Sequence, residues 1–223
     1  MGSKTSPGVV LILARLRLIA QAVLRALRDR GIDAVAMSWP EGVRRATHDL
    51  TSSDVVLLFD DLEDRESVLA AQALIAQSSA QFLVLSHRRE GAAWGAVLAS
   101  GAVAVMPTES SLDQVDAALA VARQGGSPFS EARRSRLVGE WFRWLAEDER
   151  MRARLAELSP RERQVLLLLS QGTQVADIVT ELGVAEATVR SHIRSIRRKL
   201  DVRSQLEAVA VLRRSGGPGG ADL

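Results

Sequence analysis

Arginines near the carboxyl end carry the most distinctive chemistry in this sequence. Arg190, Ser191, Arg194 and Arg198 alternate with apolar residues spaced by four, three and four positions: Val189, Ile193, Ile196 and Leu200. This spacing predicts one helix over about residues 186–200, with a buried stripe and an outward arginine face. A guanidinium can donate two parallel hydrogen bonds to a phosphate or to O6 and N7 of guanine. Such a helix suits the major groove of DNA, although a merely solvated helix face has the same pattern.

Helix start and stop signals surround these arginines. Ser159-Pro160-Arg161-Glu162 is a capping box with proline at the first helical position, and Gly172 ends that helix. Thr173 is predicted to cap a second helix that stops at Gly183. Ser204-Gln205-Leu206-Glu207 is another capping box and opens a last helix. The stretch is therefore expected to form four short helices, of which the third bears the arginines.

This stretch resembles the LuxR/NarL-type helix-turn-helix domain that ends many bacterial transcription factors. The match covers 55 of 223 residues and rests on these positions: Leu158-Ser159-Pro160-Arg161-Glu162, Gly172, Ile178, Leu182-Gly183-Val184, Glu186, Thr188-Val189-Arg190, His192, Arg198-Lys199-Leu200 and Glu207-Ala208-Val209. The resemblance implies sequence-specific binding of double-stranded DNA. The positions it implies for base contacts are Arg190, Ser191 and Arg194. The positions it implies near the phosphates are Thr188, His192, Arg198 and Lys199.

Two departures from the family pattern predict weak DNA binding by a single chain. Ala185 stands where the family usually has a Ser or Thr cap, and losing such a cap costs about 1 kcal/mol. Gln174-Val175-Ala176 lacks the usual lysine, so one phosphate contact is missing. A homodimer on paired half-sites is therefore expected. The last helix resembles the dimerising helix of the family, with Leu206, Val209 and Ala210 as candidates; alternatively these residues complete the helical core, Leu206 first among them.

The first 125 residues alternate apolar runs with helical patterns. Five runs have the length and composition of buried parallel strands: Val9–Leu13, Ala34–Met37, Val55–Phe59, Phe82–Leu85 and Ala102–Met106. The clearest intervening helix begins near Leu16 and stops at Gly31. Five βα units in succession predict an α/β fold with a doubly wound, five-stranded parallel sheet of flavodoxin-like order. Its site would lie at the carboxyl ends of the strands.

Placed before a LuxR-type domain, this region resembles the receiver domain of a NarL/FixJ-type response regulator, over roughly Val9 to Gln124. The resemblance implies a phosphotransfer site with four parts. Two acids after the first strand hold Mg²⁺, an aspartate ends the third strand, a Ser or Thr ends the fourth, and a lysine ends the fifth.

Most of those parts are replaced in this sequence. Ala14 and Arg15 stand where the two acids belong, and Phe59 stands at the aspartate position with Asp60 after it. Ser86 matches the family, whereas Pro107 or Thr108 occupies the lysine position. Mg²⁺ needs several oxygen ligands in near-octahedral geometry, which one strand end cannot supply. The receiver is therefore predicted to be degenerate, with no metal or cofactor.

We hypothesise that Arg15 pairs with Asp60 and replaces the missing metal and lysine charges, so that DNA binding does not depend on Asp phosphorylation. In the alternative, Arg15 points into solvent and Asp60 caps the next turn. Three other functions stay open: phosphorylation of Asp60 after a local bulge, binding of a small metabolite, and binding of a partner protein by the receiver-like domain. The degenerate pocket that would take the metabolite consists of Ala14, Arg15, Asp60, Ser86 and Thr108.

The connection between the two regions is predicted to be helical from Ser130 to about Leu155. Its apolar residues, Trp141 and Trp144 among them, would dock the helix on the receiver-like domain or form a dimer seam. The predicted organisation is a receiver-like domain at 8–125, a helical linker at 126–156, a DNA-binding domain at 157–214 and a flexible tail at 215–223.

Composition argues against several classes of function. The absence of cysteine excludes disulfides and thiol chemistry. Ser86 and His87 are neighbours on one strand and point to opposite sides, so no Ser–His dyad and no enzyme is expected. No apolar run approaches a membrane span, which predicts a cytoplasmic protein without a membrane partner. Residues 158–215 carry ten Lys and Arg against six Asp and Glu, which places basic excess on the predicted DNA-binding segment.

Overall fold

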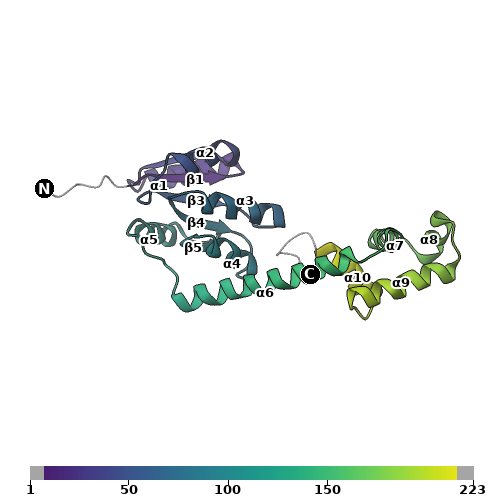
Figure 1. Cartoon of the computed structure of the whole chain (residues 1–223). Coiled ribbons are helices and arrows are strands. Elements are labelled where there is room, and N and C mark those ends of the chain that lie inside the picture. Colours follow the sequence, from purple (N-terminus) through teal and green to yellow (C-terminus); the bar gives the residue numbers. More distant parts are fainter. Residues whose placement is uncertain (1–7, 215–223) are drawn as a thin grey trace. The chain divides into compact units, whose positions relative to one another are not determined.

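The computed structural model describes residues 8–214 and divides the chain between Phe142 and Arg143 into two compact units. The N-terminal unit is built on a five-stranded parallel sheet in the order β2-β1-β3-β4-β5 (Figure 1). The strands are β1 Val10–Ala14, β2 Ala34–Ser38, β3 Val55–Phe59, β4 Gln81–Ser86 and β5 Ala104–Pro107. This order confirms the predicted flavodoxin-like doubly wound sheet. The predicted tail at 215–223 lies outside the described residues.

Helices cover both faces of the sheet. Helices α1 Arg17–Arg28 and α5 Leu112–Arg123 pack on one face, and α2 Trp39–His48, α3 Arg65–Ala76 and α4 Ala92–Ala99 lie on the other. Alternate strand residues such as Ile12, Leu57 and Leu83 point toward α1 and α5 and are fully buried. Their strand neighbours are equally buried, so both faces of the sheet are core, as expected for a parallel sheet.

The ends of the first and last strands differ from the sequence prediction. Strand β1 was predicted at Val9–Leu13, but the Val9 amide donates to Asp54 Oδ1 at 2.8 Å, and the strand begins one residue later. Strand β5 was predicted to begin at Ala102, but the Ala102 amide donates to the Val97 carbonyl at 3.1 Å, at the end of α4. In both places, a hydrogen bond to a group outside the sheet takes the amide that the strand would have used.

Helix α6, Glu131–Ala156, is continuous across the boundary between the units and lies within the predicted helical linker at 126–156. Its first half belongs to the N-terminal unit, where Leu137 and Trp141 are buried. The Arg134 guanidinium donates to the carbonyls of Leu98 and Ala102, at the end of α4. The prediction that this helix docks on the receiver-like domain is therefore confirmed.

The C-terminal unit consists of the last part of α6 and four helices around one apolar core. These helices are α7 Pro160–Ser170, α8 Val175–Leu182, α9 Glu186–Leu200 and α10 Gln205–Arg214. The capping box at Ser159 and Glu162 is present as predicted. The predicted Thr173 cap is wrong, because α8 begins after Gln174 without a side-chain cap. Gly183 ends α8 in the left-handed conformation, with φ of +62°.

The contact between α4 and α6 requires glycine at position 95. A Cβ added there would lie 2.0 Å from the carbonyl oxygen of Leu137, which is backbone and cannot rotate away. We therefore expect Gly95→Ala to force the helices apart and to lower the stability of the N-terminal unit by roughly 1–3 kcal/mol. Thermal melting followed by circular dichroism and amide exchange over residues 131–142 would measure both effects.

Gly139 on α6 provides the matched control, because a Cβ added there meets no atom within 4 Å. Gly139→Ala is expected to leave the melting temperature unchanged or slightly higher, since alanine favours helix. Equal exchange protection of α6 in Gly95→Ala and wild type would show that the close approach is not required.

Candidate functional site

Helix α9 has the two-sided character that its sequence predicts. Val189, Ile196 and Leu200 are buried in the core of the C-terminal unit, and that core is formed with α7, α8 and α10. Helix α9 begins after Ala185, which makes no side-chain cap, and ends at Asp201 in the left-handed conformation. The side of the helix opposite the buried stripe is therefore left to solvent.

The residues predicted to contact bases lie together on this solvent side. Arg190, Ser191 and Arg194 are all exposed. Arg190 is paired with a carboxylate of the same helix, because Glu186 Oε1 accepts from its Nε at 2.8 Å and lies 2.6 Å from its Nη2. Sequence reasoning did not identify this pair, although the spacing of four residues between Glu186 and Arg190 is the signal for it.

The residues predicted to lie near phosphates divide into two groups. Thr188 and Arg198 are exposed and His192 is half-buried, so they remain on or beside the solvent side. Lys199 has an internal role instead: its Nζ donates to Glu162 Oε2 at 2.7 Å and to the Glu157 carbonyl at 3.0 Å. This ammonium joins the last turn of α9 to the start of α7.

Glu162 is the central polar residue of this connection. The sequence indicated only its role in capping α7, and not its contact with Lys199. Its side chain is 6% exposed, and Oε2 also accepts from the Ser159 amide at 2.7 Å. Burial alone would raise the pKa of Glu162, but hydrogen bonds from Lys199, Ser195 and Ser159 outweigh it and lower the pKa to about 2. The carboxylate is therefore charged at neutral pH.

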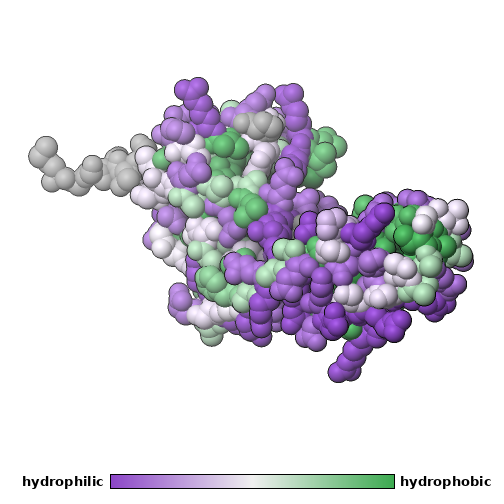
Figure 2. Space-filling view, turned by 45° about the vertical axis from the view of Figure 1, so that its right-hand side comes forward, coloured by the Kyte–Doolittle hydropathy of each residue, from purple (hydrophilic) through white to green (hydrophobic). Residues whose placement is uncertain are grey.

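The three dimerisation candidates on α10 differ in exposure. Val209 is 9% exposed and belongs to the helical core, and Ala210 is half-buried. Leu206 is 78% exposed, so the expectation that it completes the core is wrong. The cause is its position in the first turn of α10, ahead of the part of that helix that packs in the core. Figure 2 shows hydrophobic surface beside long hydrophilic side chains. In the described part of this unit, the large apolar side chains that are exposed belong to Leu167 and Leu206.

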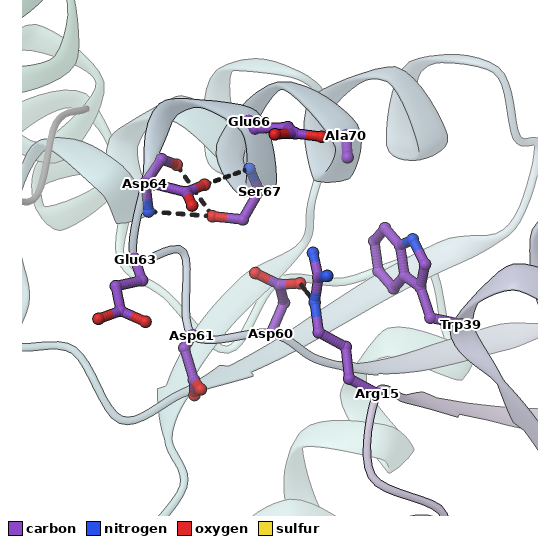
Figure 3. A pocket seen from close by; sticks show the side chains of 9 residues that line it. All are labelled: Arg15, Trp39, Asp60, Asp61, Glu63, Asp64, Glu66, Ser67 and Ala70. Atoms are coloured by element: carbon purple, nitrogen blue, oxygen red, sulfur yellow. Dashed lines mark hydrogen bonds and ion pairs between the residues drawn. The ribbon is translucent and has the colours of Figure 1, made fainter. Parts of the chain in front are cut away.

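At the carboxyl edge of the sheet, the hypothesised ion pair is present. Arg15 follows β1 and Asp60 follows β3, and these strands are neighbours in register, with Ala14 opposite Phe59. Arg15 Nε donates to Asp60 Oδ2 at 3.1 Å (Figure 3). The Arg15 guanidinium also lies 5.5 Å from the centre of the Trp39 ring, within the range of a cation–π contact.

Asp60 also caps a turn, so both roles considered for it occur together. Its Oδ1 accepts from the Leu62 amide at 2.8 Å, and Leu62 is buried with φ of +52°. A left-handed backbone is unfavourable for leucine, and this hydrogen bond helps to hold it. Burial raises the pKa of Asp60 above its usual value, although the bonds from Leu62 and Arg15 oppose the rise.

The cavity beside Asp60 differs from the predicted pocket. It has a volume of about 400 Å³ and is lined by Arg15, Trp39, Asp60, Asp61, Glu63, Asp64, Glu66, Ser67 and Ala70 (Figure 3). Ala14 and Ser86 are buried and Thr108 is exposed, and none of the three lines the cavity. The cavity lies between the β3–α3 loop and Trp39. In the sequence, the acidic run from Asp60 to Glu66 is the feature that could have indicated it.

Hydrogen bonds fix the position of the acidic run from Asp60 to Glu66. The buried Ser86 hydroxyl donates to the Asp61 carbonyl at 3.0 Å, and His87 Nδ1 contacts the Asp61 carboxylate. Asp64 caps α3 by accepting from the Ser67 amide at 2.7 Å. Within residues 8–214, no cluster of three or more His, Asp or Glu is arranged to hold a metal ion. No helix in that range is long and apolar enough to cross a bilayer.

Known proteins resemble this chain in its C-terminal unit and, more distantly, over most of its length. Residues 156–212 match the family described as bacterial regulatory proteins, luxR family. The chain is 42% identical over 59 residues to the spore germination protein GerE of Bacillus subtilis, covering 26% of this chain and 80% of GerE. It is 26% identical over 195 residues to the transcriptional regulatory protein LiaR of Bacillus subtilis, covering 87% of this chain and 90% of LiaR.

Other matches are shorter or more distant. The probable HTH-type transcriptional regulator GfsR of Streptomyces halstedii is 44% identical over 63 residues. The match covers 28% of this chain and only 25% of the length of GfsR. Among solved structures, RcsB from Salmonella enterica serovar Typhimurium bound to promoter rprA is 20% identical over 93% of this chain and 98% of that chain, with a TM-score of 0.46.

The Arg15–Asp60 pair predicts a specific pH dependence. Because the pKa of Asp60 is raised in the folded state, its ionisation costs stability as the pH rises through that pKa, and Arg15 reduces this cost. Arg15→Gln should therefore lower the melting temperature at about pH 7 more than at about pH 3, below the ordinary pKa of aspartate, where Asp60 is mostly protonated in both states. In an Asp60→Asn background, the same change should have little effect at either pH. A decrease in melting temperature that is equal at both pH values would exclude the Arg15–Asp60 pair as its cause.

Proposed function

The chain belongs to the LuxR family of bacterial regulatory proteins, and from that premise we propose that it is a transcriptional regulator that reads the major groove of DNA with α9, independently of Asp phosphorylation. One observation carries the DNA-reading proposal: α9 buries one stripe and leaves Arg190, Ser191 and Arg194 together in solvent. Arginines on an exposed helix face can reach guanine O6 and N7. The excess of basic residues in this unit favours approach to a polyanion.

Residues next to the predicted base-contacting residues could position α9 on the DNA through phosphate contacts. Thr188, His192 and Arg198 lie on or beside the solvent side of α9 and can contact phosphate oxygens without reading sequence. Lys199 is left out of this set, because its ammonium is held by Glu162 inside the unit. Its contribution to DNA binding is therefore the orientation of α9.

Independence from phosphorylation is supported by the surroundings of Asp60. Its side chain is 1% exposed, and its two oxygens accept from Arg15 and from the Leu62 amide. The only lysines of the chain are Lys4 and Lys199, so no lysine follows β5. A phosphoryl group would bond to one of these two oxygens, so it would have to displace either the hydrogen bond from Arg15 or the one from the Leu62 amide.

Two further points extend the proposal. We propose a homodimer that binds paired half-sites, because Leu206 offers an exposed apolar side chain on α10 and one α9 helix makes few contacts. A second candidate for the N-terminal unit is control by a small ligand, which the cavity of about 400 Å³ beside Arg15 and Trp39 favours. A ligand there would lie against the ion pair between Arg15 and Asp60.

Replacing Arg194 tests the assignment of the reading surface. Arg194→Ala is expected to lower discrimination at one base pair by roughly 1–3 kcal/mol, because a bidentate contact with one base is lost. Arg198→Ala should instead weaken binding to all duplexes and reduce the salt dependence of the association constant by about one unit of slope. Fluorescence anisotropy, with sites first selected from random DNA, measures both effects and the number of chains per duplex.

Arg150→Ala is the control for this experiment, since it removes the same charge from an exposed position on α6 of the same unit. It should not change base preference at any position. An unaltered site preference in Arg194→Ala would place the reading surface elsewhere.

Phosphorylation independence is tested by incubating the full chain with an acyl phosphate and Mg²⁺. We expect no phosphoryl group on Asp60 by mass spectrometry and no change in DNA affinity, because the carboxylate is buried and doubly hydrogen-bonded. Labelling that disappears in Asp60→Asn but persists in Asp61→Asn would establish phosphorylation control instead.

A further inference from the structure

We propose that Glu186 is a specificity-determining residue that positions Arg190 for one guanine and lowers affinity for non-specific DNA. This inference rests on the proposed function, since it concerns how α9 reads DNA. It begins from a pair that adds little to stability, because both side chains are largely exposed, at 65% for Arg190 and 58% for Glu186. A pair of that kind at the predicted reading surface needs another explanation.

The geometry of the pair leaves the reading edge of the arginine available. A guanidinium has five N–H groups, of which one is on Nε and two are on each terminal nitrogen. Glu186 Oε1 takes the Nε and Nη2 edge, at 2.8 Å and 2.6 Å. The edge formed by both terminal nitrogens keeps the fork that a bidentate contact with O6 and N7 of guanine requires. Glu186 therefore holds the arginine without competing for the same hydrogen bonds.

Holding Arg190 in advance reduces the entropy lost on binding. An unpaired arginine samples many rotamers, and fixing a side chain of this kind at an interface costs free energy. Of the described arginines on α9, Arg190 is the one for which the structure shows an ion pair with a carboxylate. Arg197 instead donates to the Arg203 carbonyl within the unit. The positioning is thus confined to a residue predicted to contact a base.

The charge of Glu186 acts in the opposite direction on non-specific binding. Glu186 is the first residue of α9, so its carboxylate would enter the same groove as Arg190 and face the phosphates that line it. Repulsion from phosphates weakens binding to every duplex alike. Only a duplex with guanine at the position of Arg190 recovers the lost affinity through the bidentate contact. The combined effect is a higher ratio of specific to non-specific binding.

The test uses the full chain with Glu186→Ala and Glu186→Gln, each alone and combined with Arg190→Ala. The base pair read by Arg190 is identified as the one at which Arg190→Ala relaxes the preference in a selection from random DNA. Dissociation constants are then measured for the selected duplex and for one changed at that base pair. Glu186→Ala is expected to lower this discrimination by roughly three- to tenfold and to tighten binding to the changed duplex. Glu186→Gln, which keeps an acceptor but no charge, should fall between.

Glu181→Gln supplies the matched control, because Glu181 is an exposed glutamate on α8 of the same unit. It should alter affinity only through net charge and leave the discrimination unchanged. In the Arg190→Ala background, Glu186→Ala should no longer affect discrimination, which a merely structural role would not produce. Full discrimination in Glu186→Ala, or an equal loss with and without Arg190, overturns the inference while leaving DNA binding intact. A wild-type chain that selects no sequence overturns the proposed function itself, and this inference with it.

Discussion

The solvent face of α9 depends on the burial of its opposite stripe. Val189, Ile196 and Leu200 are almost completely buried, and their spacing allows only one side of the helix to face the core. The ion pair between Lys199 and Glu162 adds a directional constraint, because it joins the last turn of α9 to the capped first turn of α7. Apolar packing alone tolerates small rotations, whereas a buried carboxylate requires its donors in place. The direction in which the arginines point is therefore set by contacts that lie away from them.

Asp60 in the N-terminal unit and Glu162 in the C-terminal unit are both buried carboxylates paired with a cation, and their pKa values move in opposite directions. Glu162 receives several hydrogen bonds, with Lys199, Ser195 and Ser159 as the donors, and its pKa falls to about 2. Asp60 receives one bond from Arg15, whose side chain is 56% exposed, and one from an amide, and burial raises its pKa. Asp60 is more deeply buried than Glu162 and receives fewer hydrogen bonds, so burial is the larger effect at Asp60 and the hydrogen bonds are the larger effect at Glu162. Arg15 therefore compensates for the burial of Asp60 only in part.

Short-range patterns in the sequence predicted much of this structure. Continuous apolar runs located all five strands, and the bounds of β3 agree at both ends. The pairing of Arg15 with Asp60 was also predictable, since residues after adjacent parallel strands meet at one edge. The internal role of Lys199 was not, because family resemblance assigns a position without showing whether another side chain already holds it. The exposure of Leu206 and the division of α6 depend on packing between elements far apart in the sequence, which periodicity within one helix does not report.

The replacement of acids by Arg15 changes the kind of control that the carboxyl edge of the sheet can exert. A bound metal ion and a phosphoryl group are exchangeable, so a site that uses them has two charge states. A guanidinium remains charged under all physiological conditions and is covalently part of the chain. The positive charge at this edge is therefore fixed, and a signal received here would work through the cavity beside it or through contacts elsewhere on the unit. A fixed positive charge at this edge is the physical ground for proposing that DNA binding does not depend on Asp phosphorylation.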